Sequence, residues 1–193
     1  MGRKLGDLAE ISQGFAVQSS VKPDPNGNVR MVRPSNGSDQ LVINWKDVVR
    51  TNVASRKTLH YLEDGDVLFF AIGREHPAYL IEKVPEGPPA IAHQHFILIR
   101  AHADWLDPGF LALVLNSESA QAVFRERASG ASGKVVNQRV LKDFEVPCLS
   151  LPEQLQWVQR WRQRCAEIGA LRAEVEMIAS RFRGDFEVEF GGR

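Results

Sequence analysis

Residues 106–161 decide the fold, and they read LDPGFLALVLNSESAQAVFRERASGASGKVVNQRVLKDFEVPCLSLPEQLQWVQRW. Their apolar and capping patterns predict a helix at 107–115, a second helical piece at 117–127, a loop at 130–133, a short helix from Asn137 and a strand at 144–147. Asp107 is an expected N-cap, with Pro108 in the first helical position. This stretch therefore combines predicted helices with a predicted strand.

A long helix is expected to follow. Ser150-x-x-Glu153 has the form of a capping box, with Pro152 in the first turn. Apolar residues then recur at gaps of three or four, at Leu155, Val158, Trp161, Cys165, Ile168, Leu171, Val175, Ile178 and Phe182. This spacing predicts a helix over 152–182 that stops at Gly184, roughly 46 Å long at 1.5 Å per residue. Its narrow apolar seam favours pairing with another helix, while folding back onto its own domain stays open.

Upstream of this stretch the sequence predicts a sheet. The run 67–73 is continuously apolar and of strand length, and it follows the turn Asp64-Gly65-Asp66. Further strands are expected at 78–84 and 95–99, separated by the turn 85–89, and a small buried strand at 41–43. Residues 18–40 are rich in Pro, Gly, Asn and Ser, which predicts a long loop interrupted by a hairpin strand at 29–32.

The composition suits one ordinary domain with an appendage. The chain has 193 residues, 44% of them hydrophobic, and its 24 basic and 24 acidic residues give a net charge of zero. The charges are unevenly spread, since residues 1–60 hold nine Lys/Arg against five Asp/Glu and residues 61–110 hold three against eight. Neutrality gives no support to non-specific nucleic-acid binding, so any DNA site must be a local patch.

Several kinds of chemistry are disfavoured. The pair His93 and His95 lacks a third metal ligand at a useful spacing, and ASGASGK departs from the phosphate-loop pattern at two positions. We find no catalytic residues, metal site or cofactor motif, which argues against an independent enzyme. We interpret Cys148 and Cys165 as small apolar residues of a protein in a reducing compartment. With no apolar run of about 18 residues and no signal-peptide pattern, the protein is expected to be cytoplasmic and free of membranes.

Binding is the class that remains. Basic residues in the polar loops are interleaved with side chains that can read base edges or stack on them, and lysine and serine suit phosphates. The candidates for DNA contact are Lys22, Arg30, Arg33, Asn44, Trp45, Lys46, Arg74, His76 and Tyr79. For each residue taken alone, a solvated surface side chain is the competing interpretation.

Five segments in order carry a family resemblance. They are Leu5–Ile11 with Gly14-Phe15, Leu62-x-x-Gly65-Asp66-Val67-Leu68-Phe69 with Gly73, Leu106–Ser117, Gly130–Asn137, and Phe144-x-Val146-Pro147 followed by Leu151-Pro152-Glu153-Gln154. Over about 150 residues this succession resembles a target recognition domain of the specificity (S) subunits of type I restriction-modification systems. Such subunits select DNA sequences for a partner methyltransferase and carry out no chemistry themselves.

The resemblance implies a mixed α/β fold: a DNA recognition domain with a half-barrel-like sheet over 1–150, a dimerisation and methyltransferase-docking helix over 151–183, and a tail over 184–193. It adds Ser132, Lys134 and Asn137 to the DNA candidates. Full S subunits carry two recognition domains and two such helices, so one of each implies a half-subunit that forms a homodimer on double-stranded DNA.

The implied partner is an adenine methyltransferase that binds S-adenosylmethionine itself, with a restriction subunit as a further candidate, in a restriction-modification or related phage-defence complex. Pairing with a different half-subunit stays open. Two competing functions also stay open: a stand-alone DNA-binding regulator or assembly module derived from this domain, and an unrecognised nuclease or nucleotide-processing enzyme.

Overall fold

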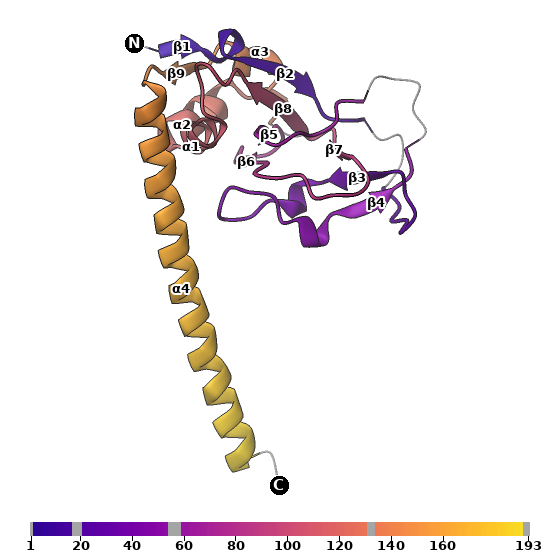
Figure 1. The fold of residues 1–193 in the computed structure, drawn as a ribbon, viewed down its shortest axis with the longest axis vertical. Helices are drawn as coiled ribbons and strands as arrows, with labels where there is room; N and C mark the ends of the chain where they lie inside the picture. The colour runs from indigo at the N-terminus through magenta and orange to yellow at the C-terminus, as the bar shows by residue number, and fades with distance from the viewer. Residues whose placement is uncertain (1, 17–20, 54–58, 131–133, 191–193) are drawn as a thin grey trace. The chain divides into compact units, whose positions relative to one another are not determined.

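The computed structural model describes residues 2–16, 21–53, 59–130 and 134–190. The chain divides into two compact units, Met1–Leu155 and Gln156–Arg193. The first unit is built of short strands and helices, and the second continues the long C-terminal helix (Figure 1). This confirms the mixed α/β fold with a long C-terminal helix.

The largest sheet of the first unit is four-stranded and antiparallel, with strand order β2-β8-β5-β6. Its strands are β2 (Ala9–Gln13), β8 (Phe96–Ala101), β5 (Asp66–Phe70) and β6 (Ala78–Leu80). β5 stops at Phe70 rather than at residue 73, because the chain turns there and Gly73 has a φ of +123°. The predicted strands at 78–84 and 95–99 are present with these shifted ends.

A second, three-stranded sheet has the order β4-β3-β7. β3 (Val29–Val32) pairs antiparallel with β4 (Val49–Thr51) and parallel with β7 (Ala90–Ala92). The hairpin strand expected at 29–32 is therefore confirmed. A third, two-stranded sheet joins β1 (Gly2–Lys4) to β9 (Glu145–Pro147).

The prediction of a small strand at 41–43 was wrong. Leu41 has a φ of 60°, in the left-handed region that an extended strand does not use. The segment makes only isolated bridges, from Val42 to Leu80 and from Ile43 to Gly37. Short 3-10 helices occupy Leu5–Asp7, Pro34–Asn36 and Trp45–Asp47.

Three short α-helices follow the strands, and each begins at a side-chain cap. Asp107 accepts a hydrogen bond from the Phe110 backbone N–H at 2.9 Å, and Ser117 and Asn137 cap their helices in the same way. The helices are α1 (Pro108–Leu115), α2 (Glu118–Arg127) and α3 (Gln138–Lys142). The caps at Asp107 and Asn137 were predicted from the sequence, because capping depends on residues close together in the chain.

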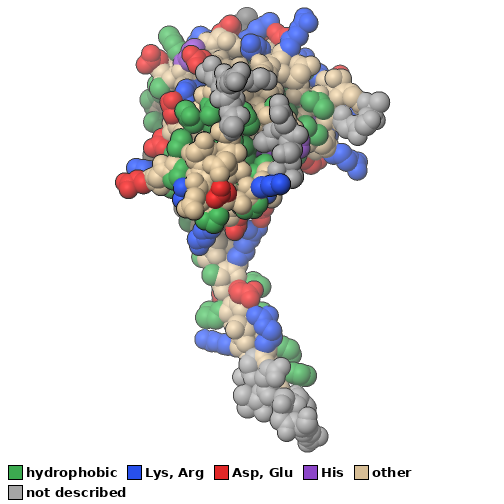
Figure 2. Space-filling model, turned by 90° about the vertical axis from the view of Figure 1, so that its right-hand side faces the viewer, with side chains coloured by type: hydrophobic (Ala, Val, Ile, Leu, Met, Phe, Trp, Pro, Cys, Tyr) green, Lys and Arg blue, Asp and Glu red, His purple; other side chains and the backbone are tan. Residues whose placement is uncertain are grey.

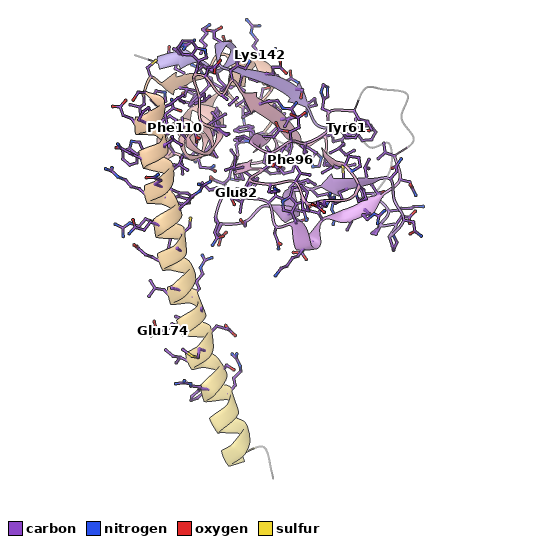
Figure 3. All side chains as sticks on the ribbon, in the orientation of Figure 1. Tyr61, Glu82, Phe96, Phe110, Lys142 and Glu174 are labelled. Atoms are coloured by element: carbon purple, nitrogen blue, oxygen red, sulfur yellow. The ribbon has the colours of Figure 1, made fainter. Side chains whose placement is uncertain are left out.

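The core of the first unit lies on both faces of the four-stranded sheet. Between the two larger sheets, Phe96 and Leu68 pack with Val32 and Ala92 (Figure 3). On the opposite face, which α1 and α2 cover, Phe69 lies 4.9 Å from Phe124, centroid to centroid. Successive residues of β5 thus alternate between the two halves of the core.

The long helix α4 (Leu151–Phe190) has 40 residues. The predicted stop at Gly184 was wrong, since the helix continues through it; a glycine inside a helix costs only about 1 kcal/mol, and no proline follows. Of the predicted seam, Val158 is buried and Trp161 half-buried, while these are exposed: Leu155, Ile168, Leu171, Val175, Ile178 and Phe182. Figure 2 shows hydrophobic, basic and acidic side chains next to one another along this helix. Among the described residues, no helix is both long and apolar enough to cross a membrane.

Candidate nucleic-acid interface

Segments that lie far apart in the sequence meet at one end of the four-stranded sheet. Gln13 ends β2 opposite Ile97, and Phe70 ends β5 opposite Phe96, where β8 begins. The loops that leave β2 and β5 and the loop that enters β8 therefore share this end. We call it the loop end and define it by Gly14–Phe15, 71–74, His93–His95 and 134–139.

The segment before α3 is fixed to the loop end by backbone hydrogen bonds. The Val136 N–H donates to the carbonyl of Ala71, and the Gly73 N–H donates to the carbonyl of Lys134, both at 2.9 Å. The positive φ of Gly73 gives its N–H the orientation for the second bond. As a result, the exposed side chains of Arg74 and Lys134 flank one backbone pairing.

The three-stranded sheet is joined to the loop end near Gly14, where the backbone of His93 lies close. A Cβ on Gly14 would lie 2.2 Å from the carbonyl oxygen of His93, so no larger residue fits there. The His93 N–H in turn donates to the carbonyl of Val32, the last residue of β3, at 2.9 Å. Arg33, which follows β3, is thereby brought beside His93.

The loop end carries several cationic or potentially cationic side chains. Arg33 is partly buried, Arg74 and Lys134 are exposed, and the rings of His93 and His95 lie 4.3 Å apart. Burial lowers the pKa of His93, and the nearby His95 and Arg33 lower it further. A carboxylate in this region, Glu75, lies 3.6 Å from Arg125, which offsets its charge.

The opposite end of the sheet is acidic. Glu63 and Asp64 precede β5, Asp66 begins it, Glu10 lies near the start of β2, and Glu82 follows β6 (Figure 3).

One arginine partly neutralises this acidic end. Arg100 donates from Nε to Asp66 and from Nη1 to Glu63, each at 2.8 Å, and its hydrogen bond to Asp66 raises its pKa. Because its partners are carboxylates of the same sheet end, Arg100 stabilises the fold rather than offering a cation to a ligand. The uneven charge of the sequence thus becomes a polarity between the two ends of one sheet.

The structure brings together some of the predicted DNA contacts and separates others. Arg33, Arg74, Lys134 and Asn137 lie at or beside the loop end. Lys22 does not, because its carbonyl accepts a hydrogen bond from Thr51 Oγ1 near the start of β3, whereas Arg33 follows the end of that strand. Asn44 and Lys46 belong to a separate turn by β6, and Ser132 lies outside the described residues.

The prediction that His76 contacts DNA was wrong. The residue is 0% exposed, its ring stacks on Phe69 with centroids 5.8 Å apart, and its Nδ1 lies 3.1 Å from the carbonyl oxygen of Phe70. Its backbone N–H also donates to Gln121 of α2 at 3.0 Å. His76 is therefore part of the core that joins the sheet to the helices.

Three other candidates are occupied by packing, and we do not retain them. The Arg30 side chain donates from Nε to the carbonyl of Pro88 at 2.9 Å and from Nη2 to that of Pro85, and its guanidinium lies 5.7 Å from the ring centroid of Trp45. Burial lowers the pKa of Arg30. Trp45 and Tyr79 pack against the core between the sheets. Because these contacts are made by residues distant in sequence, the loop pattern did not indicate them.

Sequence reasoning missed a hollow of about 450 Å³ at the loop end. Its polar lining comes from Gln13, Gln94, Asn137, Gln138 and Arg139, of which only Asn137 had been considered. Gln94 lies between the two histidines that were weighed solely as metal ligands. Within the part of the chain that the structure describes, no three His, Cys, Asp or Glu residues are grouped so that they could hold a metal ion.

Comparisons with known proteins identify the class of fold. No protein-family model matches the chain, and no curated protein matches its sequence. Solved structures do match: the HsdS subunit from Thermoanaerobacter tengcongensis has a TM-score of 0.55 at 17% identity, over 89% of this chain and 38% of that one. The type I restriction-modification S subunit from M. genitalium has a TM-score of 0.61 at 18% identity, over 98% of this chain and 45% of that one.

A third match comes from a structural description of complex assembly in a type I restriction-modification system. Its TM-score is 0.58 at 18% identity, and it covers 93% of this chain and 42% of that one. The fold is therefore the one seen in these S subunits, and the resemblance inferred from the sequence is confirmed at the level of the fold. The chain spans less than half the length of each structure it matches.

The burial of His76 predicts a pH dependence of stability. Desolvation lowers the pKa of His76 below its ordinary value of 6.5, so the unfolded chain binds the proton more readily. The free energy of unfolding should then be highest above pH 6.5 and fall as the pH drops towards the lowered pKa. The substitution His76→Phe keeps a ring on Phe69 and removes the titration, so urea unfolding between pH 5 and 8 should show a shallower fall.

The variant His102→Gln provides the matched control, because it removes a histidine that the fold leaves exposed. An unaltered slope in His76→Phe, together with weaker DNA binding, would restore His76 as a contact residue.

Proposed function

We propose that this chain is a non-catalytic, sequence-specific DNA-binding subunit that directs a partner adenine methyltransferase to its target site. The observation that carries the proposal is the convergence of Arg33, Arg74, Lys134 and the amide-lined hollow at one end of a sheet whose other end is acidic. The fold shared with S subunits supports the same function.

The chemistry of the loop end suits a duplex. Lysine and arginine bind phosphates and hold the register, while arginine and side-chain amides read base edges in the major groove. The acidic end, with Glu10, Glu63 and Asp64, repels phosphate and so favours one orientation of the subunit on DNA. Because the whole chain is neutral, its non-specific affinity is expected to be modest, and contacts at the loop end must supply most of the binding.

The long helix supplies the means of assembly in this proposal. Exposed apolar residues at spacings of three and four, from Ile168 to Phe182, form a stripe that a second helix can cover. A homodimer through α4 would present two recognition units to a split palindromic site, and the same helices would dock the methyltransferase. The methyltransferase would bind S-adenosylmethionine, and a restriction subunit would join the complex in a cleavage system.

Methylation in cells tests the function directly. Adenine methylation is mapped in cells that express the partner methyltransferase with and without this chain, and one sequence motif should be methylated only when the chain is present. Binding of the purified chain to that motif without any effect on methylation would instead support a DNA-binding regulator.

Two exposed cations should behave differently in DNA-binding assays with the cognate motif. Lys134→Ala should weaken binding to all sequences alike and make the salt dependence less steep, as loss of a phosphate contact does. Arg74→Ala should relax the preference at one base pair by about 1–3 kcal/mol. A change of base preference in Lys134→Ala, or uniform weakening in Arg74→Ala, would contradict these roles. The exposed Lys83, near the acidic end, gives a control whose substitution by alanine should change neither quantity.

Self-association should depend on the face of α4 that carries the stripe. Val175 is 66% exposed, and Val175→Glu places a charge in the stripe, which should raise the dimer Kd by about 100-fold or more at a cost of about 3 kcal/mol. Ala173→Glu adds the same charge in the same turn, but at 100° per residue it lies on the opposite face and should leave the dimer intact. Analytical ultracentrifugation measures both, and equal behaviour of the two variants would rule out the stripe as the interface.

A further inference from the structure

The hollow at the loop end has an apolar interior. Ala71 and Val136 are buried there, while Ile72 is partly buried and Val135 is 37% exposed. Val135 is held firmly, since its N–H donates to the carbonyl of Ser129 at 2.8 Å and its carbonyl accepts from the Ser129 N–H at 3.1 Å. A β-branched side chain on a fixed backbone thus presents its methyl groups at an open surface.

Side-chain amides surround this apolar interior. Gln13 is committed to the fold, because its Nε2 donates to the backbone carbonyls of Gln94 and Phe96 at 2.6 and 3.0 Å. Asn137 uses its Oδ1 to cap α3, accepting from the Val140 N–H at 3.1 Å.

Two further amides line the hollow. For the side chains of Gln94 and Gln138, no hydrogen bond to another described residue is found. Each therefore offers both a donor and an acceptor to a ligand, and each is only partly buried.

The combination of side-chain amides with an apolar interior distinguishes A·T from G·C base pairs. In the major groove adenine presents an acceptor (N7) beside a donor (N6–H), which matches a side-chain amide, and thymine presents a methyl group that matches an apolar contact. Guanine presents two acceptors and cytosine no methyl group, so a G·C pair would leave the amide carbonyl unpaired and the valine without its contact. The exposed Lys134 and Arg139, whose side chain is 92% exposed, lie beside the hollow and suit the flanking phosphates.

We infer that the hollow reads an A·T base pair, with the side-chain amide of Gln94 or Gln138 on the adenine edge and Val135 against the thymine methyl. This inference rests on the proposed function, because it names which base pair of the target the loop end recognises. It also assigns base reading to residues on a rigid backbone, between two strands and at the start of a capped helix.

Selection from randomised DNA tests the inference with the full chain alone. The purified protein is incubated with a library of random duplexes, and the bound fraction is sequenced. The wild type should enrich a motif that contains at least one A·T position. Gln94→Ala or Gln138→Ala should reduce the preference at that position by about 10-fold and leave the other positions unchanged, while Gln40→Ala, an exposed amide outside the hollow, should leave the whole motif unchanged.

Modified bases test the same contacts without changing the protein at all. Replacing the selected adenine by 7-deazaadenine removes N7, and replacing the thymine by uracil removes the methyl group; each should weaken wild-type binding about 5- to 10-fold. Replacing thymine by uracil should not weaken DNA binding by Val135→Ala any further. Likewise, 7-deazaadenine should not further weaken binding by the glutamine variant that has lost the preference for A·T.

The outcomes separate this inference from the function it deepens. A wild-type motif that neither glutamine variant changes, or one that tolerates both modified bases, would overturn the assignment of the hollow and leave the DNA-binding function standing. If the wild type enriched no motif at all, the proposed function would fall and the inference with it.

Discussion

The arrangement of the recognition unit depends on one short backbone pairing. Ala71 and Gly73, just past the end of β5, exchange hydrogen bonds with Val136 and Lys134. This pairing fixes the segment before α3 to the end of β5, and a second pairing, between Val135 and Ser129, holds the same segment from its other side. The side chains of Arg74 and Lys134, from distant parts of the sequence, therefore lie at a fixed separation, as the proposed recognition of a regular duplex requires. Rigid placement of this kind also lowers the entropic cost of binding.

Antiparallel pairing turns an uneven sequence into a polar surface. Residues 61–110 are rich in carboxylates, and three of these side chains, Glu63, Asp64 and Asp66, lie at or just before the start of β5. The basic residues follow the ends of strands instead, as Arg33 and Arg74 do. β2 and β5 both run antiparallel to β8, which lies between them, so both strands begin at one end of the sheet and finish at the other. A neutral chain thereby gains a directional field without any excess of charge.

Local features were predictable from the sequence, and contacts between distant residues were not. Asp107 and Asn137 cap helices because the bonded groups lie three residues away, so the pattern alone indicates them. His76 looked like a loop residue, yet Gln121, distant in sequence, draws it into the core. Arg30 was similarly taken for a free cation, although the carbonyls of Pro85 and Pro88 occupy it. The hollow was not predicted for the same reason, since it is assembled from four separate segments of the chain.

In the proposed function, recognition and self-association would reinforce each other energetically. A single unit of zero net charge would make few contacts with DNA, and its specific affinity would be limited by what the loop end provides. Joining two copies through α4 would make the second binding event intramolecular, so weak individual contacts would add up to tight binding only where both half-sites are present. A strongly basic domain would gain affinity for every sequence and lose this discrimination. Under this proposal, low charge in the first unit and an exposed apolar stripe on the helix are therefore two parts of one way to bind selectively.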